Sequence, residues 1–268
     1  MRIGIKCVVN GDEIPDGECL RCRINNCDRV DHDCGIPYEI LAGIMDRSGR
    51  ETAHTSATML TNTCQRRVWL ENHEDYYVNP LTMFPAFRGT MGHKMTEGYP
   101  QPNCIYEKRF ESVIKIGKTR VKITGALDKL DIDNAHIEDF KTKGDSKLVR
   151  LKGPEEAHTL QLNIYRWLVF NGWPQKKFTH NGIEYKPNKP AKIQVNSLRL
   201  NYWSMGKIKL FEPEIMDLLD VEEYIYERAT ILLGSLPAIP PELDPFKSKI
   251  CVDWCSLRDH CIRHEIGF

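Results

Sequence analysis

Two acidic residues and a lysine near the middle of the chain have a spacing that suits metal-dependent hydrolysis. The segment "GALDKLDIDNAHIEDFKTK" contains Asp128, Asp139 and Lys141. We interpret it as a β-hairpin that turns at Asp133 and Asn134, because both residue types tolerate left-handed backbone conformations. In that register Asp128 lies directly opposite Asp139, with both carboxylates on one face of the hairpin.

The opposed carboxylates predict a site for a divalent metal ion. Two like charges roughly 5 Å apart repel each other across a strand pair, but Mg²⁺ or Mn²⁺ between them makes the pair favourable. Lys141 projects from the same face as Asp139, where it can orient water or stabilise charge on a phosphate. Glu138 alternates to the other face and is not part of the predicted site. Taken alone, the Asp-x-Lys triplet also fits an ordinary exposed hairpin face.

Helices and strands in the surrounding sequence must position these residues. Strand-like runs occupy 105–116, 119–127, 127–132, 135–141 and 193–203, with a turn at Gly117-Lys118. Helical patterns begin at Ser56, cover 88–98 and 155–170, and resume at Pro213 to end near Gly234. Residues 174–192 are rich in Pro, Lys and Asn and predict a loop. Helices flanking a central sheet predict an α/β or α+β domain.

Four motifs in order resemble the PD-(D/E)XK nuclease superfamily in its RecB-like branch. They are "RGTMGHKM" with His93, Gly125-Ala126-Leu127-Asp128, Asp139-Phe140-Lys141-Thr142, and Gln161-x-x-x-Tyr165. The resemblance spans roughly residues 56–261 and implies a restriction-endonuclease-like mixed sheet flanked by helices. It also implies the ligands of the Mg²⁺ or Mn²⁺ ion, which are His93, Asp128, Asp139 and the backbone carbonyl of Phe140.

The resemblance implies further roles for Lys141, Gln161 and Tyr165. Lys141 would assist the nucleophilic water, and the other two would hold the substrate or orient the lysine. Gln161 and Tyr165 are four residues apart and therefore share one face of the predicted helix. A glutamine among apolar neighbours needs hydrogen-bond partners when it is buried. A helix with a satisfied polar residue and no functional role fits this segment equally well.

Cys64 and three C-terminal cysteines predict a metal cluster that joins distant parts of the chain. Cys251, Cys255 and Cys261 lie in "CVDWCSLRDHC", and Cys64 precedes a helical segment. Four thiolates can hold a [4Fe–4S] cluster or a zinc ion. The pattern is similar to the iron–sulfur subgroup of RecB-like nucleases, including CRISPR-associated exonucleases, although the first spacing is C-x3-C where that subgroup has C-x2-C. Three small buried hydrophobic residues are the alternative, which their polar neighbours disfavour.

Clustered cysteines near the N-terminus predict a structural zinc site. Five of the ten cysteines lie within the first 34 residues, and in a reducing compartment such clusters more often bind metal than form disulfides. The predicted ligands are Cys19, Cys22, Cys27 and Cys34. Cys7 and His32 are possible substitutes for one of them. The predicted zinc-binding appendage covers residues 1–50 and could grip DNA, dock a protein partner or stabilise its own fold.

Charge is balanced in total but unevenly distributed along the chain. The formal net charge is zero, while residues 115–122, 141–152 and 176–192 are strongly basic and residues 212–227 are acidic. The basic runs are candidates for tracking a nucleic-acid backbone, with Phe178, Tyr185 and Trp203 as candidates for base stacking. The sequence has no membrane-length apolar run and no signal peptide, so we expect an intracellular, cytoplasmic protein.

These patterns predict a metal-dependent deoxyribonuclease with a nuclease domain over residues 51–268. Hydrolysis of single-stranded DNA ends, as an exonuclease, is the function that the resemblance favours. A structure- or sequence-specific endonuclease is the first alternative, because the same core supports both activities. A non-catalytic, metal-stapled DNA-binding or adaptor protein is the second. The combination of His93, Asp128, Asp139 and Lys141 argues against it, since a binding module has no need of opposed carboxylates.

Overall fold

The computed structural model describes the chain at residues 2–24, 34–45, 55–101, 103–204, 206–240, 243, 247–248, 251, 255 and 257–266. Within these ranges, side chains are described except at 23, 24, 85, 86, 88, 93, 95–97, 259, 260, 265 and 266. Packing divides the chain into two units. The sheet unit is His54–Thr63 with Gly89–Ser235, and the terminal unit is Met1–Ala53 with Cys64–Arg88 and Leu236–Phe268. The predicted domain boundary at residue 50 stays a prediction.

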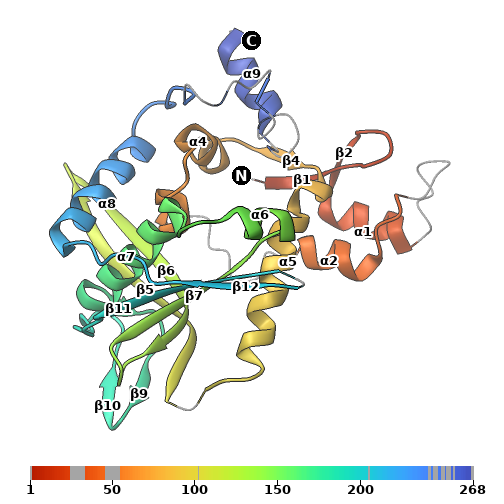
Figure 1. The fold of residues 1–268 in the computed structure, drawn as a ribbon. Coiled ribbons are helices and arrows are strands. Elements are labelled where there is room, and N and C mark those ends of the chain that lie inside the picture. Colours follow the sequence, from red (N-terminus) through yellow and green to blue (C-terminus); the bar gives the residue numbers. More distant parts are fainter. Residues whose placement is uncertain are drawn as a thin grey trace. The chain divides into compact units, whose positions relative to one another are not determined.

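A seven-stranded mixed sheet forms the centre of the sheet unit (Figure 1). Its strands follow the order β12-β11-β7-β6-β5-β8, and β3 pairs with β6. β7 and β11 are parallel, whereas β5 and β6, β6 and β7, and β11 and β12 pair antiparallel. The predicted mixed sheet flanked by helices is confirmed. The strands are β3 (Thr55–Ser56), β5 (Cys104–Ile116), β6 (Thr119–Asp131), β7 (His136–Thr142), β8 (Trp173–Pro174), β11 (Ser197–Trp203) and β12 (Ile208–Phe211).

Helix α7 (Glu156–Asn171) packs between this sheet and helix α8 (Leu218–Leu233). Most of its side chains from Gln161 to Val169 are buried, as expected for a helix that is covered on two sides. The Trp167 indole donates to Glu222 Oε2 at 3.1 Å and fixes α8 against α7. The shorter helices α3 (Ala57–Leu60) and α6 (Asp145–Arg150) complete this unit, and α5 (Pro80–Glu97) has residues in both units.

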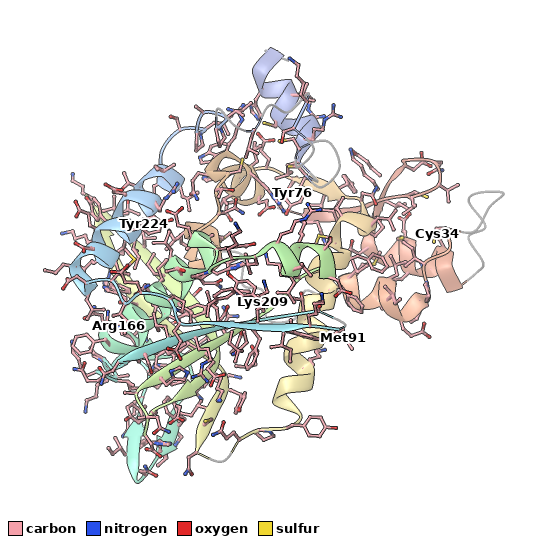
Figure 2. All side chains as sticks on the ribbon, viewed as in Figure 1. Cys34, Tyr76, Met91, Arg166, Lys209 and Tyr224 are labelled. Atoms are coloured by element: carbon pink, nitrogen blue, oxygen red, sulfur yellow. The ribbon has the colours of Figure 1, made fainter. Side chains whose placement is uncertain are left out.

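A lysine of the edge strand holds the end of α6. The Lys209 ammonium donates to the carbonyl oxygens of Val149 and Leu151 at 3.0 and 2.7 Å (Figure 2). Carbonyl groups at the end of a helix have no partner within the helix, and a cation there is also favoured by the helix dipole. This contact fixes the segment that follows β7 next to β12.

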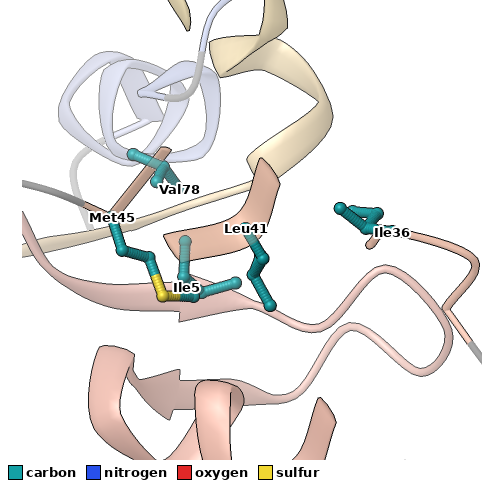
Figure 3. Packing of buried hydrophobic residues seen from close by; sticks show 5 residues of the cluster. All are labelled: Ile5, Ile36, Leu41, Met45 and Val78. Carbon is teal, nitrogen blue, oxygen red and sulfur yellow. The ribbon is translucent and has the colours of Figure 1, made fainter. Parts of the chain in front are cut away.

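The terminal unit contains a small three-stranded sheet in the order β2-β1-β4. Its buried apolar cluster comprises Ile5, Ile36, Leu41, Met45 and Val78 (Figure 3). The elements are β1 (Arg2–Lys6), β2 (Glu13–Pro15), β4 (Tyr76–Val78), α1 (Asp16–Ile24), α2 (Tyr38–Met45), α4 (Gln65–His73) and α9 (Arg258–Ile266).

Several predicted element boundaries are wrong for local reasons. The helical pattern after Ser56 forms two helices, because Ser56 caps the short α3 and a break precedes α4. The last long helix begins after Asp217 instead of at Pro213, since Asp217 Oδ1 accepts from the amide of Leu219 at 2.8 Å.

The segment 174–192, predicted as a loop, contains a short hairpin. Its strands are β9 (Phe178–His180) and β10 (Ile183–Tyr185), and Asn181 and Gly182 between them have φ values of 48° and 78°. An Asn-Gly pair with positive φ is the preferred two-residue hairpin turn.

Among the described residues, no helix is both long and apolar enough to cross a bilayer.

Gly125 sets how closely α7 approaches β6. A Cβ atom at this position would lie 2.7 Å from Tyr165 Cε1 and 2.8 Å from Leu168 Cδ1. Both distances are well below ordinary carbon contacts, and both partners are ring or branched carbons buried in the core. The absence of a side chain at Gly125 therefore allows Tyr165 to lie directly on the strand that carries Asp128.

We predict that Gly125→Ala lowers the free energy of unfolding by about 1–3 kcal/mol, the usual cost of overpacking a core. Gly153→Ala is the matched control, because a Cβ there meets nothing within 4 Å. Equilibrium denaturant unfolding at neutral pH measures both. Equal stabilities of the two variants would contradict the close packing of α7 on β6.

Candidate active site

The hairpin of β6 and β7 has the predicted register. Lys129 pairs with Glu138, and Asp131 pairs with His136; the next position in this register places Asp128 opposite Asp139. The predicted two-residue turn is wrong, because four residues, 132–135, connect the strands. Asn134 bonds to the Asp131 carboxylate, and Ala135 takes the left-handed conformation at φ 51°. The longer turn keeps the register because it adds one residue on each side.

Asp139 is buried without hydrogen bonds to its carboxylate. It is 1% exposed, and neither carboxylate oxygen has a donor in hydrogen-bonding geometry. Lys141 Nζ lies 2.7 Å from Oδ2, an ion-pair distance whose geometry does not satisfy a hydrogen bond. Burial raises the pKa of Asp139 to about 6; Lys141 opposes the increase and Asp128 adds to it. A buried carboxylate in this state gains strongly from a cation.

Asp128 and Lys141 complete a charged cluster around Asp139. Asp128 is 6% exposed, and its Oδ2 accepts from the amide of Phe140 at 2.7 Å. Burial alone would lower the pKa of Lys141, but the Asp139 and Asp128 charges outweigh it and raise that pKa. Lys141 is therefore a cation at neutral pH and acts as a donor instead of a base. Two neighbouring carboxylates, with the Asp139 oxygens buried and not hydrogen-bonded, suit a hard divalent ion.

Glu107 is a fourth charged residue near this cluster, and the sequence analysis missed it. Tyr106 and Lys108 of β5 pair with Lys129 and Leu127 of β6, so Glu107 lies across from Asp128. Its φ is 46°, which is uncommon for a residue with a side chain within a strand. Its charge contributes to raising the pKa of Lys141. The Gly117-Lys118 turn, carried back along both strands, could have identified this position.

Gln161 and Tyr165 form a hydrogen-bonded pair beside the carboxylates. Gln161 Nε2 donates to Tyr165 Oη at 2.6 Å and to Thr58 Oγ1 at 3.1 Å. Both residues of the pair are 4% exposed. Burial, and then the Asp139 and Asp128 charges, raise the pKa of Tyr165 well above its usual value. The buried glutamine thus has the partners that its sequence context requires, and Thr58 is one that the sequence analysis did not identify.

A second polar network borders Lys141. His158 Nδ1 lies 2.8 Å from Tyr202 Oη, which also accepts from the amide of Glu155. Lys143 Nζ pairs with Glu155 at 2.7 Å. Burial, followed by the charge of Lys141, lowers the pKa of His158 to about 4, so this histidine is neutral. His158 precedes Gln161 by three residues and shares its helix face, a spacing that could have revealed it.

The remaining predicted residue of the active site, His93, has a side chain outside the described residues. Its helix, α5, passes the ends of β7 and β11. A Cβ at Gly89 would lie 3.8 Å from Thr142 Oγ1, and one at Gly92 would lie 2.3 Å from Trp203 Cζ2. Trp203 therefore packs against a helical glycine.

Glu138, predicted to face away from Asp139, bonds to Lys129 and Asn201 at 2.8 and 3.0 Å.

The four cysteines predicted to hold a cluster lie around one cavity of the terminal unit. They are Cys64, Cys251, Cys255 and Cys261. Burial raises the pKa of Cys64, Cys255 and Cys261, and Arg66 or Arg67 opposes the increase. Among the described residues, no group of three or more potential ligand side chains is arranged to hold a metal ion. The fold brings the four cysteines together around this cavity. Their binding of a metal stays a prediction.

Of the cysteines predicted to bind zinc, three surround a second cavity, and Cys7 joins them there. These are Cys19, Cys22 and Cys34. Cys27 and the possible substitute His32 lie outside the described residues. Cysteines that the structure describes carry no disulfides.

The basic runs are largely at the surface of the sheet unit. Lys115, Lys118 and Arg120 are exposed, as are most lysines of 176–192. Phe178 and Tyr185 stack on each other with centroids 4.7 Å apart, and Lys108 lies over the Phe178 ring. These two rings have a packing role within the hairpin and its base, and their contact with nucleic-acid bases stays a prediction.

Comparison with known proteins identifies one family. Residues 40–262 match the model of the PD-(D/E)XK nuclease superfamily. A solved structure titled "Crystal structure of SSO0001" is 20% identical, with a TM-score of 0.48 and coverage of 74% of this chain and 85% of that chain. No curated protein sequence matches. The family match includes every strand and helix that carries the carboxylates, the lysine and the Gln161–Tyr165 pair.

We predict that ionisation of Asp139 destabilises the metal-free protein as pH rises. The folded state holds this proton up to about pH 6, whereas the unfolded chain releases it near pH 3.8. Between these values the folded state binds more protons, so stability falls with rising pH, by up to about 3 kcal/mol in total. The Asp139→Asn variant has no carboxyl proton at this position, so it should lack this loss of stability.

Denaturant unfolding in EDTA from pH 4 to 7 tests this. His158, whose pKa of about 4 is below its usual value of 6.5, acts in the opposite direction over much of that range. The wild type is therefore compared with Asp139→Asn, since both retain His158. We expect the wild type to lose stability relative to the variant as pH rises. A constant difference in stability, or one that changes in the wild type's favour, would contradict a raised pKa of the buried Asp139 carboxyl.

Proposed function

Because the chain belongs to the PD-(D/E)XK nuclease superfamily, we propose that it is a divalent-metal-dependent deoxyribonuclease that degrades single-stranded DNA from its ends. The observation that carries this proposal is the Asp139 carboxylate, which is 1% exposed and faces Asp128 and Lys141. Two buried carboxylates beside one lysine leave a negative charge that the fold does not neutralise, which costs stability. The position of Asp139 beside Asp128, where β6 and β7 pair, fits a residue that holds a metal ion for catalysis.

Asp128, Asp139 and the Phe140 carbonyl would hold Mg²⁺ or Mn²⁺, with His93 as a further proposed ligand. When bound, the ion supplies Lewis-acid polarisation and neutralises charge that develops on the phosphate. Lys141, protonated beside Asp139, donates to the attacking water or to a phosphate oxygen as negative charge increases. Water gives up a proton as its oxygen attacks phosphorus, the bond to the leaving oxygen breaks, and the leaving oxygen takes up a proton.

Gln161 and Tyr165 act as positioning residues in this proposal. Their mutual bond at 2.6 Å, and the bond of Gln161 to Thr58, fix both side chains on the face of α7 that lies over Gly125. The Tyr165 hydroxyl accepts from Gln161 and keeps its own proton, so it can donate to a neighbouring carboxylate or a phosphate. The rigid pair thereby restricts the orientation of the charged groups beneath it.

We also propose that Cys64, Cys251, Cys255 and Cys261 bind a [4Fe–4S] cluster, with zinc as the alternative. The support is that cysteines separated by almost 190 residues line one cavity, beside the cationic side chains of Arg66 and Arg67. Arg66 is 4% exposed and donates to the carbonyl of Pro237 at 2.8 Å. Burial raises the pKa of Cys64, Cys255 and Cys261, and the positive charge of these arginines opposes that increase in favour of thiolates, the form that binds metal.

We expect anaerobically purified protein to shorten end-labelled linear single-stranded DNA only when Mg²⁺ or Mn²⁺ is present. Asp139→Ala and Lys141→Ala should each reduce the rate at least about 100-fold, because each removes a charge that acts on the transition state. Gel electrophoresis of the labelled products measures the rate, and closed circular single-stranded DNA serves as the control substrate.

Products from the circular substrate would change the assignment to an endonuclease. Binding without cleavage of either substrate, in protein with a full metal content, would overturn the nuclease proposal. Glu138→Gln is the matched variant control, since Glu138 projects from the opposite face of β7 and bonds to Lys129 and Asn201. It should retain most of the wild-type rate.

We predict that Cys64→Ser loses the iron and the broad visible absorbance of an iron–sulfur cluster and unfolds at a lower temperature. Loss of one of four ligands weakens a cluster that connects α4 to the C-terminal segment. Cys104→Ser, on β5 of the sheet unit, is the control and should retain iron. Wild-type protein with zinc and no iron at these cysteines would establish the alternative metal.

A further inference from the structure

The described side chains of helix α1 make few apolar contacts with the rest of the terminal unit. None of its described side chains, from Asp16 to Cys22, is fully buried. Leu20 and Cys19 pack against the apolar cluster only in part, and Arg2 bonds to Asp16 at 3.1 Å. Surface helices usually dock through an apolar stripe. Cys22 lies three positions after Cys19, so the two cysteines share one face of α1, and both line the cavity beside the cluster.

Two further cysteines reach the same cavity from other segments. Cys7 follows β1, in a tight loop where its amide donates to Asp12 O at 2.7 Å and its carbonyl accepts from Gly11 at 2.9 Å. Cys34 precedes α2 and packs partly against the apolar cluster (Figure 2). The four cysteines line the cavity together with Ile5 and Leu41 of that cluster. Figure 3 shows how Ile5 and Leu41 lie within the cluster. Three separate segments of the terminal unit therefore contribute thiols to one place.

We propose that Cys7, Cys19, Cys22 and Cys34 bind one structural zinc ion. Four thiolates match the donor set of closed, tetrahedral zinc sites. Two come from the Cys-x2-Cys pair of α1, one from the loop after β1 and one from the segment before α2. The described side chains are not arranged around an ion, so binding requires their thiols to turn into the cavity that they already line. The sequence predicted Cys19, Cys22, Cys27 and Cys34 with Cys7 as a possible substitute, and in this proposal Cys7 is the fourth ligand.

The zinc ion would replace the apolar packing that α1 lacks. Among the described residues, the cluster beside the cavity has five buried apolar members, which is a small core for β1, α1 and α2 together. Metal binding to cysteines contributes directly to folding when the chain cannot otherwise order the segments that carry them. The site therefore connects β1, α1 and the start of α2, independently of the carboxylates of the sheet unit and of whether the protein cleaves DNA.

Metal analysis of full-length variants tests the ligand set. We expect wild-type protein expressed with added zinc to contain about one zinc ion per chain at this site, in addition to the metal of the other cysteine group. Cys7→Ser should lose this zinc, whereas Cys27→Ser and Cys104→Ser should retain it. Cys7→His should also retain it, because imidazole is a zinc ligand. That retention would show that zinc loss in Cys7→Ser is not caused by misfolding.

Each result has a defined meaning. Loss of zinc from Cys27→Ser with retention in Cys7→Ser would overturn the proposed ligands. Absence of zinc from the wild type, or alkylation and mass spectrometry that find these cysteines in disulfides, would overturn the site itself. Iron content and DNA cleavage are measured on the same samples, so failure of the nuclease proposal and failure of the zinc proposal are distinguished. Zinc loss in Cys7→Ser with iron unchanged would support the site.

Discussion

The electrostatics of the candidate site depend on the burial of one carboxylate, that of Asp139. An ionised group taken out of water must regain its lost solvation from nearby charge. Lys141 supplies part of this, and the opposing charge of Asp128 removes part of it, leaving the pKa of Asp139 near 6. The antiparallel register of β6 and β7 brings the two acids together. Gly125 then allows Tyr165 and Leu168 of α7 to pack closely on β6.

The regular spacing of side chains in strands and helices explains which parts of the site the sequence could predict. Side chains alternate along a strand and repeat every three to four positions along a helix, so local spacing alone placed Asp128 opposite Asp139 and Gln161 near Tyr165. The register was correct although the turn was not, because a symmetric change in loop length moves no pair. Glu107 and His158 were missed since their importance comes from pairing with β6 and from the neighbourhood of Lys141.

Other features could not be predicted because they depend on contacts distant in sequence. Tyr202 becomes a partner of His158 only when β11 pairs with β7. Thr58 meets Gln161 across more than 100 residues. The cysteines are a partial exception. The resemblance already grouped Cys64 with the C-terminal cysteines, the sequence left Cys7 as a possible substitute ligand, and the fold places each group around one cavity. Short strands such as β9 and β10 have too few residues for a clear periodicity.

The central claim is that Asp128 and Asp139 hold a divalent ion, and anomalous diffraction from crystals soaked in Mn²⁺ tests it most directly. The account predicts an anomalous peak between the two carboxylates, within coordination distance of an oxygen from each and of the Phe140 carbonyl. The same crystals of Asp139→Asn should lack it. A clear wild-type map with no peak there, or with Mn²⁺ bound only elsewhere, would contradict the account.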